Sequence, residues 1–164
     1  MKIRKSAEKD IAAIVELGLL AWEPVFASFK NLMGSRNYAI LFPDWKKSQQ
    51  EEIEKACRDT ETLDTYVAEV EGKVVGFTTI KMEPEKKAGE IYFLAVHPEA
   101  QNMGVGSFLN SYVIKKMKDA GMKVISVSTG GDVSHAPARH CYEKSGFKFS
   151  IPSVTYYMDL TEAE

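Results

Sequence analysis

The stretch Val96-His-Pro-Glu-Ala-Gln-Asn-Met-Gly-Val-Gly106 decides the fold. An apolar run, Ile91–Val96, leads into it, and a helical apolar pattern from about Gly104 to Ala120 follows it. The chain therefore passes from a buried strand, through a turn at Pro98, into a helix. The first N–H groups of a helix have no internal acceptor, and the helix dipole adds positive potential there. Because glycines let a ligand approach the backbone closely, the stretch predicts an anion site at the end of a central strand.

Two familiar phosphate-binding loops do not fit this turn. A Walker loop needs Gly-Lys-Ser/Thr, which the chain lacks, and a dinucleotide fingerprint needs a third Gly or Ala where Leu109 stands. Taken alone, the glycines at 104 and 106 are equally compatible with tight packing between the strand and the helix. The turn by itself thus indicates an anion without naming it.

Outward from this turn, the hydrophobic period alternates between strand and helix. Upstream we expect a strand at 2–4, a helix from Ser6 to about Trp22 with Pro24 at its end or at a bend, a polar helix at 48–58, and strands at 65–70, 73–82 and 89–96. Downstream we expect a strand at 124–129, a helix capped by Ser134 that runs to Lys144, and closing strands at 147–149 and 154–160. This order predicts one α/β domain, residues 1–164, with a mixed sheet and right-handed parallel crossovers.

Composition narrows the function classes. The chain has 164 residues with 21 Lys plus Arg and 23 Asp plus Glu, a net charge of −2 that gives no bulk reason to bind nucleic acid. No apolar run reaches the length of about 18 residues that a membrane span needs, and the apolar stretch 11–22 has helical periodicity. Cys57 and Cys141 have no partner at a zinc or redox spacing, and His135 and His140 are five apart, so we expect no metal site. We expect a cytoplasmic protein with reduced thiols.

Three blocks together carry a resemblance to a known family. Gln101-x-x-Gly104-x-Gly106 resembles the pyrophosphate loop of the GNAT superfamily, the acyl-CoA-dependent N-acetyltransferases. Glu90–Pro98 resembles the fourth strand of that family, and Tyr142-Glu-Lys-Ser-Gly-Phe147 resembles its signature at the end of the last helix. The order of elements is similar over nearly the whole chain. The chain departs from the family at His135, where Asn is frequent, and at Asn102-Met103, where basic residues or Gly are frequent.

The resemblance implies a fold and a co-substrate. The fold would be a GNAT-like, mixed and mostly antiparallel sheet of six to seven strands, splayed between strands 4 and 5, with about four helices on its two faces. The co-substrate would be acetyl-CoA, with its pyrophosphate on the main-chain N–H groups of the turn and its pantetheine arm paired with the strand before it. The residues implied for acetyl-CoA are Leu94, Ala95, Val96, Gln101, Asn102, Met103, Gly104, Val105, Gly106, Ser107, His135 and Ala138.

The resemblance also implies roles in catalysis. An amine that attacks a thioester must lose a proton, and the departing thiolate gains one. Tyr142 matches the general acid of the family, although its helical spacing alone indicates a packed Tyr. Glu90 stands where some members place the base; the alternatives are a solvent-facing Glu and deprotonation through ordered water. Trp22, Phe26 and Phe29 are expected either in the core or on the wall of the acceptor pocket.

The sequence therefore predicts an N-acetyltransferase that moves an acetyl group from acetyl-CoA to a primary amine, of a small molecule or a peptide, by direct attack in a ternary complex. The alternative is an acyl-CoA sensor or interaction module without catalysis. The acceptor amine is not identified by the sequence. A homodimer is compatible with the exposed late strands that we expect.

Overall fold

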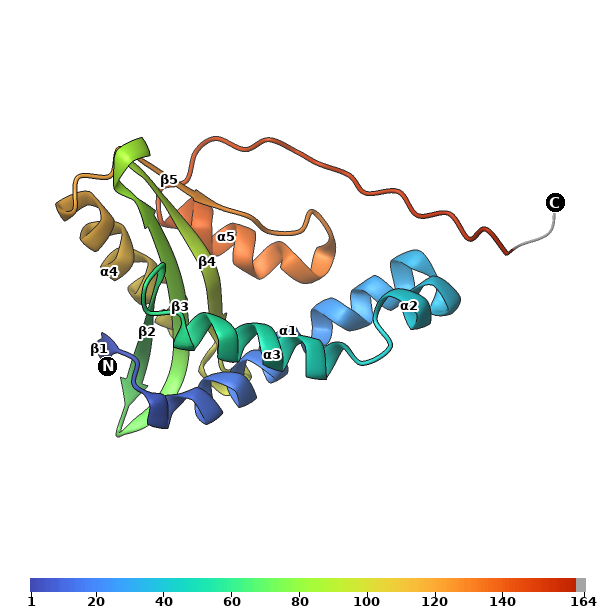
Figure 1. Ribbon diagram of the computed structural model, residues 1–164, viewed down its shortest axis with the longest axis horizontal. Helices are drawn as coiled ribbons and strands as arrows, with labels where there is room; N and C mark the ends of the chain where they lie inside the picture. Colours follow the sequence, from blue (N-terminus) through green and yellow to red (C-terminus); the bar gives the residue numbers. More distant parts are fainter. Residues whose placement is uncertain (162–164) are drawn as a thin grey trace.

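A five-stranded sheet, in the order β1-β2-β3-β4-β5, organises the chain (Figure 1). The computed structural model describes residues 1–161. The first four strands are antiparallel neighbours, and β5 lies parallel to β4. The hairpin between β2 and β3 turns at Glu71 and Gly72, both with positive φ, as hairpin turns that follow the strand twist require. The strands are β1 Lys2–Lys5, β2 Leu63–Val70, β3 Lys73–Glu83, β4 Ala88–Val96 and β5 Val124–Val127.

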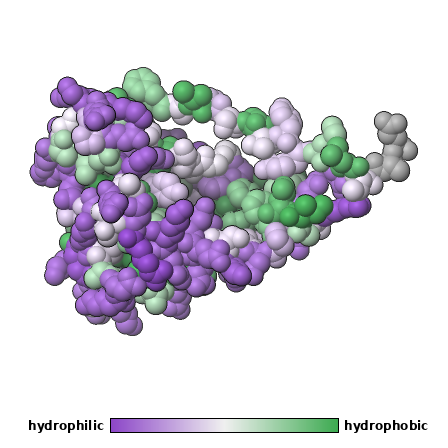
Figure 2. Space-filling model, viewed as in Figure 1, coloured by the Kyte–Doolittle hydropathy of each residue, from purple (hydrophilic) through white to green (hydrophobic). Residues whose placement is uncertain are grey.

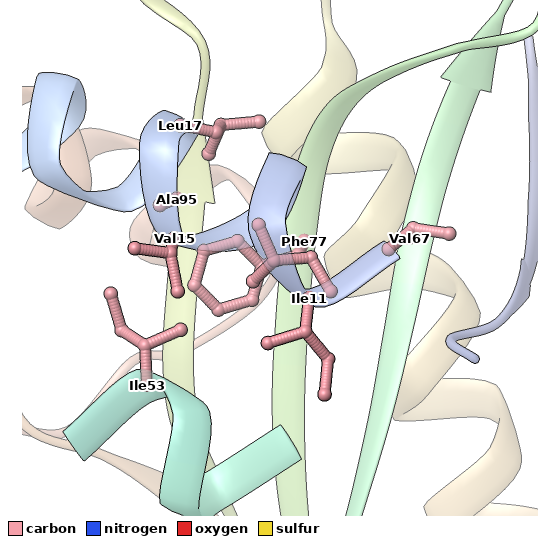
Figure 3. Packing of buried hydrophobic residues seen from close by; sticks show 8 residues of the cluster. Ile11, Val15, Leu17, Ile53, Val67, Phe77 and Ala95 are labelled. Carbon is pink, nitrogen blue, oxygen red and sulfur yellow. The ribbon is translucent and has the colours of Figure 1, made fainter. Parts of the chain in front are cut away.

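Helices cover both faces of the sheet. They are α1 Ile11–Met33, α2 Ser35–Leu41, α3 Trp45–Arg58, α4 Val105–Asp119 and α5 Ala136–Lys144. On one face, buried side chains of α1 and α3 pack on Phe77 and Val67 of the sheet (Figure 3). On the other face, Leu109, Val113 and Met117 of α4 pack against residues of β2, β3 and β4. These two layers hold β4 in the middle of the core and so fix the position of the turn that follows it.

The helix that begins near the N-terminus is longer than predicted. Pro24 neither ends nor interrupts α1, which continues for nine residues beyond it to Met33. By length and composition α1 could cross a membrane, but Ile14 and Leu17 of its apolar face are buried on the sheet. The sequence prediction of about four helices is corrected to five, because the aromatic region after residue 33 adds the separate short helix α2.

β4 has a bulge at the point where its pairing with β5 ends. In the register with β3, Thr79 pairs with Phe93 and Ile80 pairs with Ile91, so Tyr92 is left without a partner. The pairing of β4 with β5 covers only Ala88–Ile91 and stops at the same point. The remainder of β4, up to Val96, has β3 as its one neighbour in the described chain. The predicted splay between strands 4 and 5 is thus present, and the bulge marks where it starts.

The closing strands predicted at 147–149 and 154–160 are wrong. Residues 147–159 follow an extended path (Figure 1) but pair with no strand among the described residues, so the sheet has five strands rather than six or seven. Figure 2 shows hydrophobic side chains spaced along this segment, and Phe149, Ile151 and Tyr156 are each at least 90% exposed. Near its end, Asp159 is held by Arg36 of α2 at 3.2 Å. Alternating apolar residues are therefore not enough for a strand when the chain is led away from the sheet edge.

Candidate active site

The turn before α4 presents a row of free main-chain donors. Asn102 and Gly104 have left-handed φ values of 63° and 82°. The first backbone hydrogen bond of the helix runs from the N–H of Phe108 to the carbonyl of Gly104, at 2.9 Å. Within residues 1–161, no backbone N–H from Asn102 to Ser107 has an acceptor. Such a row at a helix N-terminus suits the pyrophosphate of coenzyme A.

The two glycines of the turn have different roles. A Cβ on Gly104 would meet no atom within 4 Å, so Gly104 is needed for its left-handed φ. A Cβ on Gly106 would lie 3.2 Å from Sγ of Cys141 and 3.6 Å from Cγ2 of Val96. Gly106 therefore lets α4 approach α5 and β4 closely. Gly106 thus has the packing role that the sequence left open, whereas Gly104 is required by the backbone conformation of the turn.

The end of β4 lies beside this turn with one edge unpaired. Leu94, Ala95 and Val96 lie beyond the last pair with β5, so their main-chain groups on that side have no strand to bind. The side chain of Gln101 folds back, and its Nε2 donates to the carbonyl of Val96 at 3.3 Å. Gln101 thus closes the turn onto β4, while the open edge is suited to an extended ligand that pairs like a strand.

Tyr142 lies on α5, and its ring is buried. It is 8% exposed and packs edge-on against Phe147 at a centroid distance of 5.9 Å. Within residues 1–161 its hydroxyl has no hydrogen-bond partner, so no protein group occupies its donor. Burial, followed by the charge of Cys141, raises the pKa of Tyr142 to about 12. The phenol stays protonated at neutral pH and can donate a proton.

The other predicted site residues lie in several places. Glu90 is half-buried on β4, where it pairs with Lys81 of β3 and Ser126 of β5, just before the splay. Ala138 is half-buried on α5. Met103 is 71% exposed at the tip of the turn. Ser107 is half-buried in the first turn of α4.

The three aromatic residues predicted for the acceptor pocket divide between core and wall. Trp22 packs on Phe77 and Phe93 of the sheet, with centroids 6.2 and 5.4 Å away, and belongs to the core. Phe26 is 8% exposed and stacks on Trp45 at 4.2 Å. Phe29, one turn further along α1, is half-buried and lies 6.0 Å from the ring of His135. Phe29 is therefore the member of the three that reaches the loop after β5.

That loop contains a cluster that the sequence prediction missed. Asp132 accepts hydrogen bonds from Ser28 of α1 at 2.6 Å and from His135 Nδ1 at 2.5 Å, and also from the hydroxyl of Ser134. Its burial raises the pKa, but the bonds from Ser134, Ser28 and His135 outweigh burial and hold the pKa below its ordinary value. The sequence showed Gly130-Gly131-Asp132 only as a turn. The usable signal was the pair Asp132 and His135 three residues apart.

Comparisons with known proteins agree with this fold. The model of the Acetyltransferase (GNAT) family matches residues 28–147. A mycothiol acetyltransferase of Saccharomonospora viridis is 29% identical over 127 residues, which cover 69% of this chain and 41% of that protein. A mycothiol acetyltransferase of Thermomonospora curvata is 32% identical over 91 residues, which cover 56% of this chain and 30% of that protein. The chain thus spans less than half of these relatives. The PaiA N-acetyltransferase of Thermoplasma acidophilum, solved with coenzyme A, has a TM-score of 0.75 at 18% identity and covers 93% of this chain and 92% of its own.

Proposed function

This chain belongs to the acetyltransferase (GNAT) family, whose members use acetyl-CoA as co-substrate, and on that premise we propose that it acetylates a primary amine. The observation that carries the proposal is the row of free N–H groups from Asn102 to Ser107, at the open end of β4. Donors fixed by backbone conformation need no reorganisation to receive a diphosphate. Two free cysteines accord with a reducing compartment such as the cytoplasm.

The proposed reaction is direct attack of the amine on the thioester. Main-chain groups of Leu94–Val96 pair with the pantetheine arm, which sets the acetyl group beside the splay. Tyr142 gives its proton to the departing sulfur, because its raised pKa keeps it protonated at neutral pH. Glu90 is the candidate base that the sequence indicated, half-buried where the splay begins.

The acceptor is proposed to enter from the side of α1 and α2. Phe29 and Phe42, with ring centroids 5.9 Å apart, form an aromatic wall there. Relatives of this chain are named for mycothiol, which places small-molecule amines first among the acceptors to be tried. Light scattering distinguishes a monomer from the homodimer that the sequence allows.

Calorimetric titration of coenzyme A tests the anion site with a matched pair of variants. Gly104 and Gly121 flank the two ends of α4 and have φ of 82° and 85°, and a Cβ added at either glycine would meet no atom within 4 Å. Gly104→Ala and Gly121→Ala should each cost about 1–2 kcal/mol of unfolding free energy through left-handed strain. Only Gly104→Ala should also weaken coenzyme A binding, by about tenfold or more, because its methyl lies where the ligand approaches the backbone. Equal affinities in the two variants would contradict the site.

A thiol-release screen tests the reaction. Acetyl-CoA is offered with small amines, polyamines, aminoglycosides and peptides with free N-termini, and the free thiol and the product mass are measured. Acetylated amine together with stoichiometric thiol supports the proposal. Tight coenzyme A binding without thiol release from any acceptor overturns the catalytic function.

A further inference from the structure

The loop between β5 and α5 holds a histidine–carboxylate pair in one orientation. The side chains of Asp132 and His135 are 13% and 17% exposed, and Nδ1 of His135 lies 2.5 Å from Oδ1 of Asp132. The other carboxylate oxygen, Oδ2, accepts from the hydroxyl of Ser28 at 2.6 Å and from the backbone N–H of Ser134 at 3.2 Å. Both oxygens are therefore engaged, and the imidazole is tied to α1 through one carboxylate.

The backbone around the pair is fixed as well. Nη1 of Arg139 donates to the carbonyls of Gly130 and Asp132, at 2.6 and 2.7 Å. A Cβ on Gly130 would lie 2.7 Å from Oδ1 of Asp132, so glycine is needed for the loop to pass this close. The guanidinium binds carbonyls, not the carboxylate, and so leaves the carboxylate charge to act on His135.

This arrangement selects the tautomer of His135. Because Nδ1–H donates to the carboxylate, the lone pair of the neutral ring is on Nε2. Within residues 1–161, Nε2 has no hydrogen-bond partner. The ring is contacted by Phe29 from α1 and by Asp132 and Ser134 from the loop. Ser28 of α1 binds Asp132, and Arg139 of α5 binds the loop carbonyls, so the charged groups of this cluster are Asp132 and Arg139.

The pair lies at the opening of the splay, on the acceptor side. His135 follows β5, and the turn at 102–107 follows β4, so both lie beyond the carboxyl ends of two parallel strands that separate. Ligands of α/β sheets bind in crevices at such ends. Phe29, from the wall assigned to the acceptor, is the aromatic neighbour of His135.

We propose that His135, oriented by Asp132, is the base that removes a proton from the acceptor ammonium; this rests on the proposed function. The proton passes from nitrogen to Nε2, and the imidazolium forms beside the Asp132 carboxylate. The neutral amine then attacks the thioester carbonyl carbon: the N–C bond forms, the C–S bond breaks, and the thiol sulfur gains a proton from Tyr142, which recovers one from the amide nitrogen through water. His135 returns its proton to solvent, so the net products are amide, thiol and one proton. The assignment differs from the sequence expectation, in which His135 contacts the cofactor and Glu90 is the candidate base; here His135 takes the place of Glu90 as the base.

The pH dependence of kcat/KM separates these roles. The transition state keeps the acceptor's proton on the base, so log kcat/KM of the parent should rise with unit slope only until the base is deprotonated and then level off below the pKa of the acceptor ammonium. His135→Gln should lose about 100-fold in kcat/KM for the amine and should lose this plateau, so that log kcat/KM rises with unit slope up to the pKa of the ammonium, while the affinity for acetyl-CoA stays unchanged. His140→Gln, at an exposed position of α5, is the matched control and should keep the plateau. A weaker acetyl-CoA affinity with the plateau intact would assign His135 to the cofactor and overturn the proposal, as would loss of the plateau in Glu90→Gln instead.

Two further readouts exclude a purely structural role. Added imidazole should restore at least tenfold of the activity lost in His135→Ala, as expected when a missing base is replaced, and failure to do so in a variant that melts like the parent would overturn the proposal. In the chain without ligand, 15N NMR should show His135 protonated on Nδ1, and Asp132→Asn should abolish that preference; a His135 protonated on Nε2 overturns it. Absence of thiol release with every acceptor overturns the proposed function and removes the substrate of this base. Normal turnover of His135→Gln overturns the base alone.

Discussion

The turn before α4 and the loop after β5 flank the same opening, but they are built from different groups. The turn presents main-chain N–H groups, and the side chain at its tip, Met103, is 71% exposed. The loop depends on side chains, with Asp132 binding Ser28 and His135. A site made of main-chain groups requires only the right φ values, whereas a site made of side chains requires a particular amino acid at each position. The proposed coenzyme side therefore leaves a signal in the sequence, in two glycines and the blocks around them, while the proposed acceptor side becomes visible only in the structure.

The largest effect is expected from a substitution in the turn before α4, whose main-chain N–H groups are the proposed phosphate donors. Gly106→Glu adds a carboxylate beside the N–H groups that we propose bind the phosphates, and two like charges ~4 Å apart at an effective dielectric of about 20 repel by about 4 kcal/mol. Calorimetry should show coenzyme A affinity reduced by about a thousandfold. Gly106→Ala makes the same 3.2 Å Cβ contact with Cys141 without the charge and reports the packing cost through its melting temperature. Ser111→Glu, an exposed charge further along α4, should bind nearly as the parent does. Parent-like affinity in Gly106→Glu would remove the turn from the site.

A smaller effect is expected at Tyr142 of α5, the proposed acid of the reaction. Tyr142→Phe removes a hydroxyl that has no hydrogen-bond partner in the described chain, so stability and coenzyme A affinity should stay near those of the parent. Turnover should fall by about 100-fold because the thiolate leaves without its acid. Tyr112→Phe, which alters a half-buried tyrosine of α4, is the control. An unchanged turnover number in Tyr142→Phe would show that the sulfur gets its proton from elsewhere.

The smallest effect is expected in the pH dependence of stability, which should involve the loop with Asp132 and not the turn before α4. The hydrogen bonds to Asp132 hold its folded pKa below the unfolded value of about 3.9. Its contribution to stability is therefore fully present above that value and is lost as the pH falls through the folded pKa. The turn at 101–107 has no titratable side chain. The stability difference between the parent and Asp132→Asn should accordingly shrink from about pH 6 to about pH 3, as followed by thermal unfolding. A difference that grows as the pH falls would contradict the sign of this linkage.

Local signals explain what the sequence could predict. β4, the glycine turn and α4 depend on periodicity and on Gly104, which act within a few residues, and all three are present near their predicted bounds. The separation of β4 from β5 was implied by family resemblance, but the bulge at Tyr92 that marks its start was not visible. The Asp132 cluster was missed because its partner Ser28 is 104 residues away in sequence.

The closing strands after residue 147 were wrongly predicted because strand formation, like the Asp132 cluster, depends on residues distant in sequence. The segment 154–160 alternates like a strand, yet a strand also needs a neighbour that offers matching N–H and C=O groups. After Phe147 the chain leaves the sheet, and Asp159 is paired with Arg36 on α2. The alternation of apolar and polar residues indicates which side chains share a face of a strand. Whether a neighbouring strand is available to pair with it is decided by distant parts of the chain.

The open segment after Phe147 has a consequence for handling the protein. An extended, uncovered main chain is the shape that proteases bind in their clefts, and Tyr156 and Tyr157, 90% and 50% exposed, would be early chymotryptic cleavage points. Such a nick would fall after α5 and would leave every strand and helix of residues 1–161 uncut.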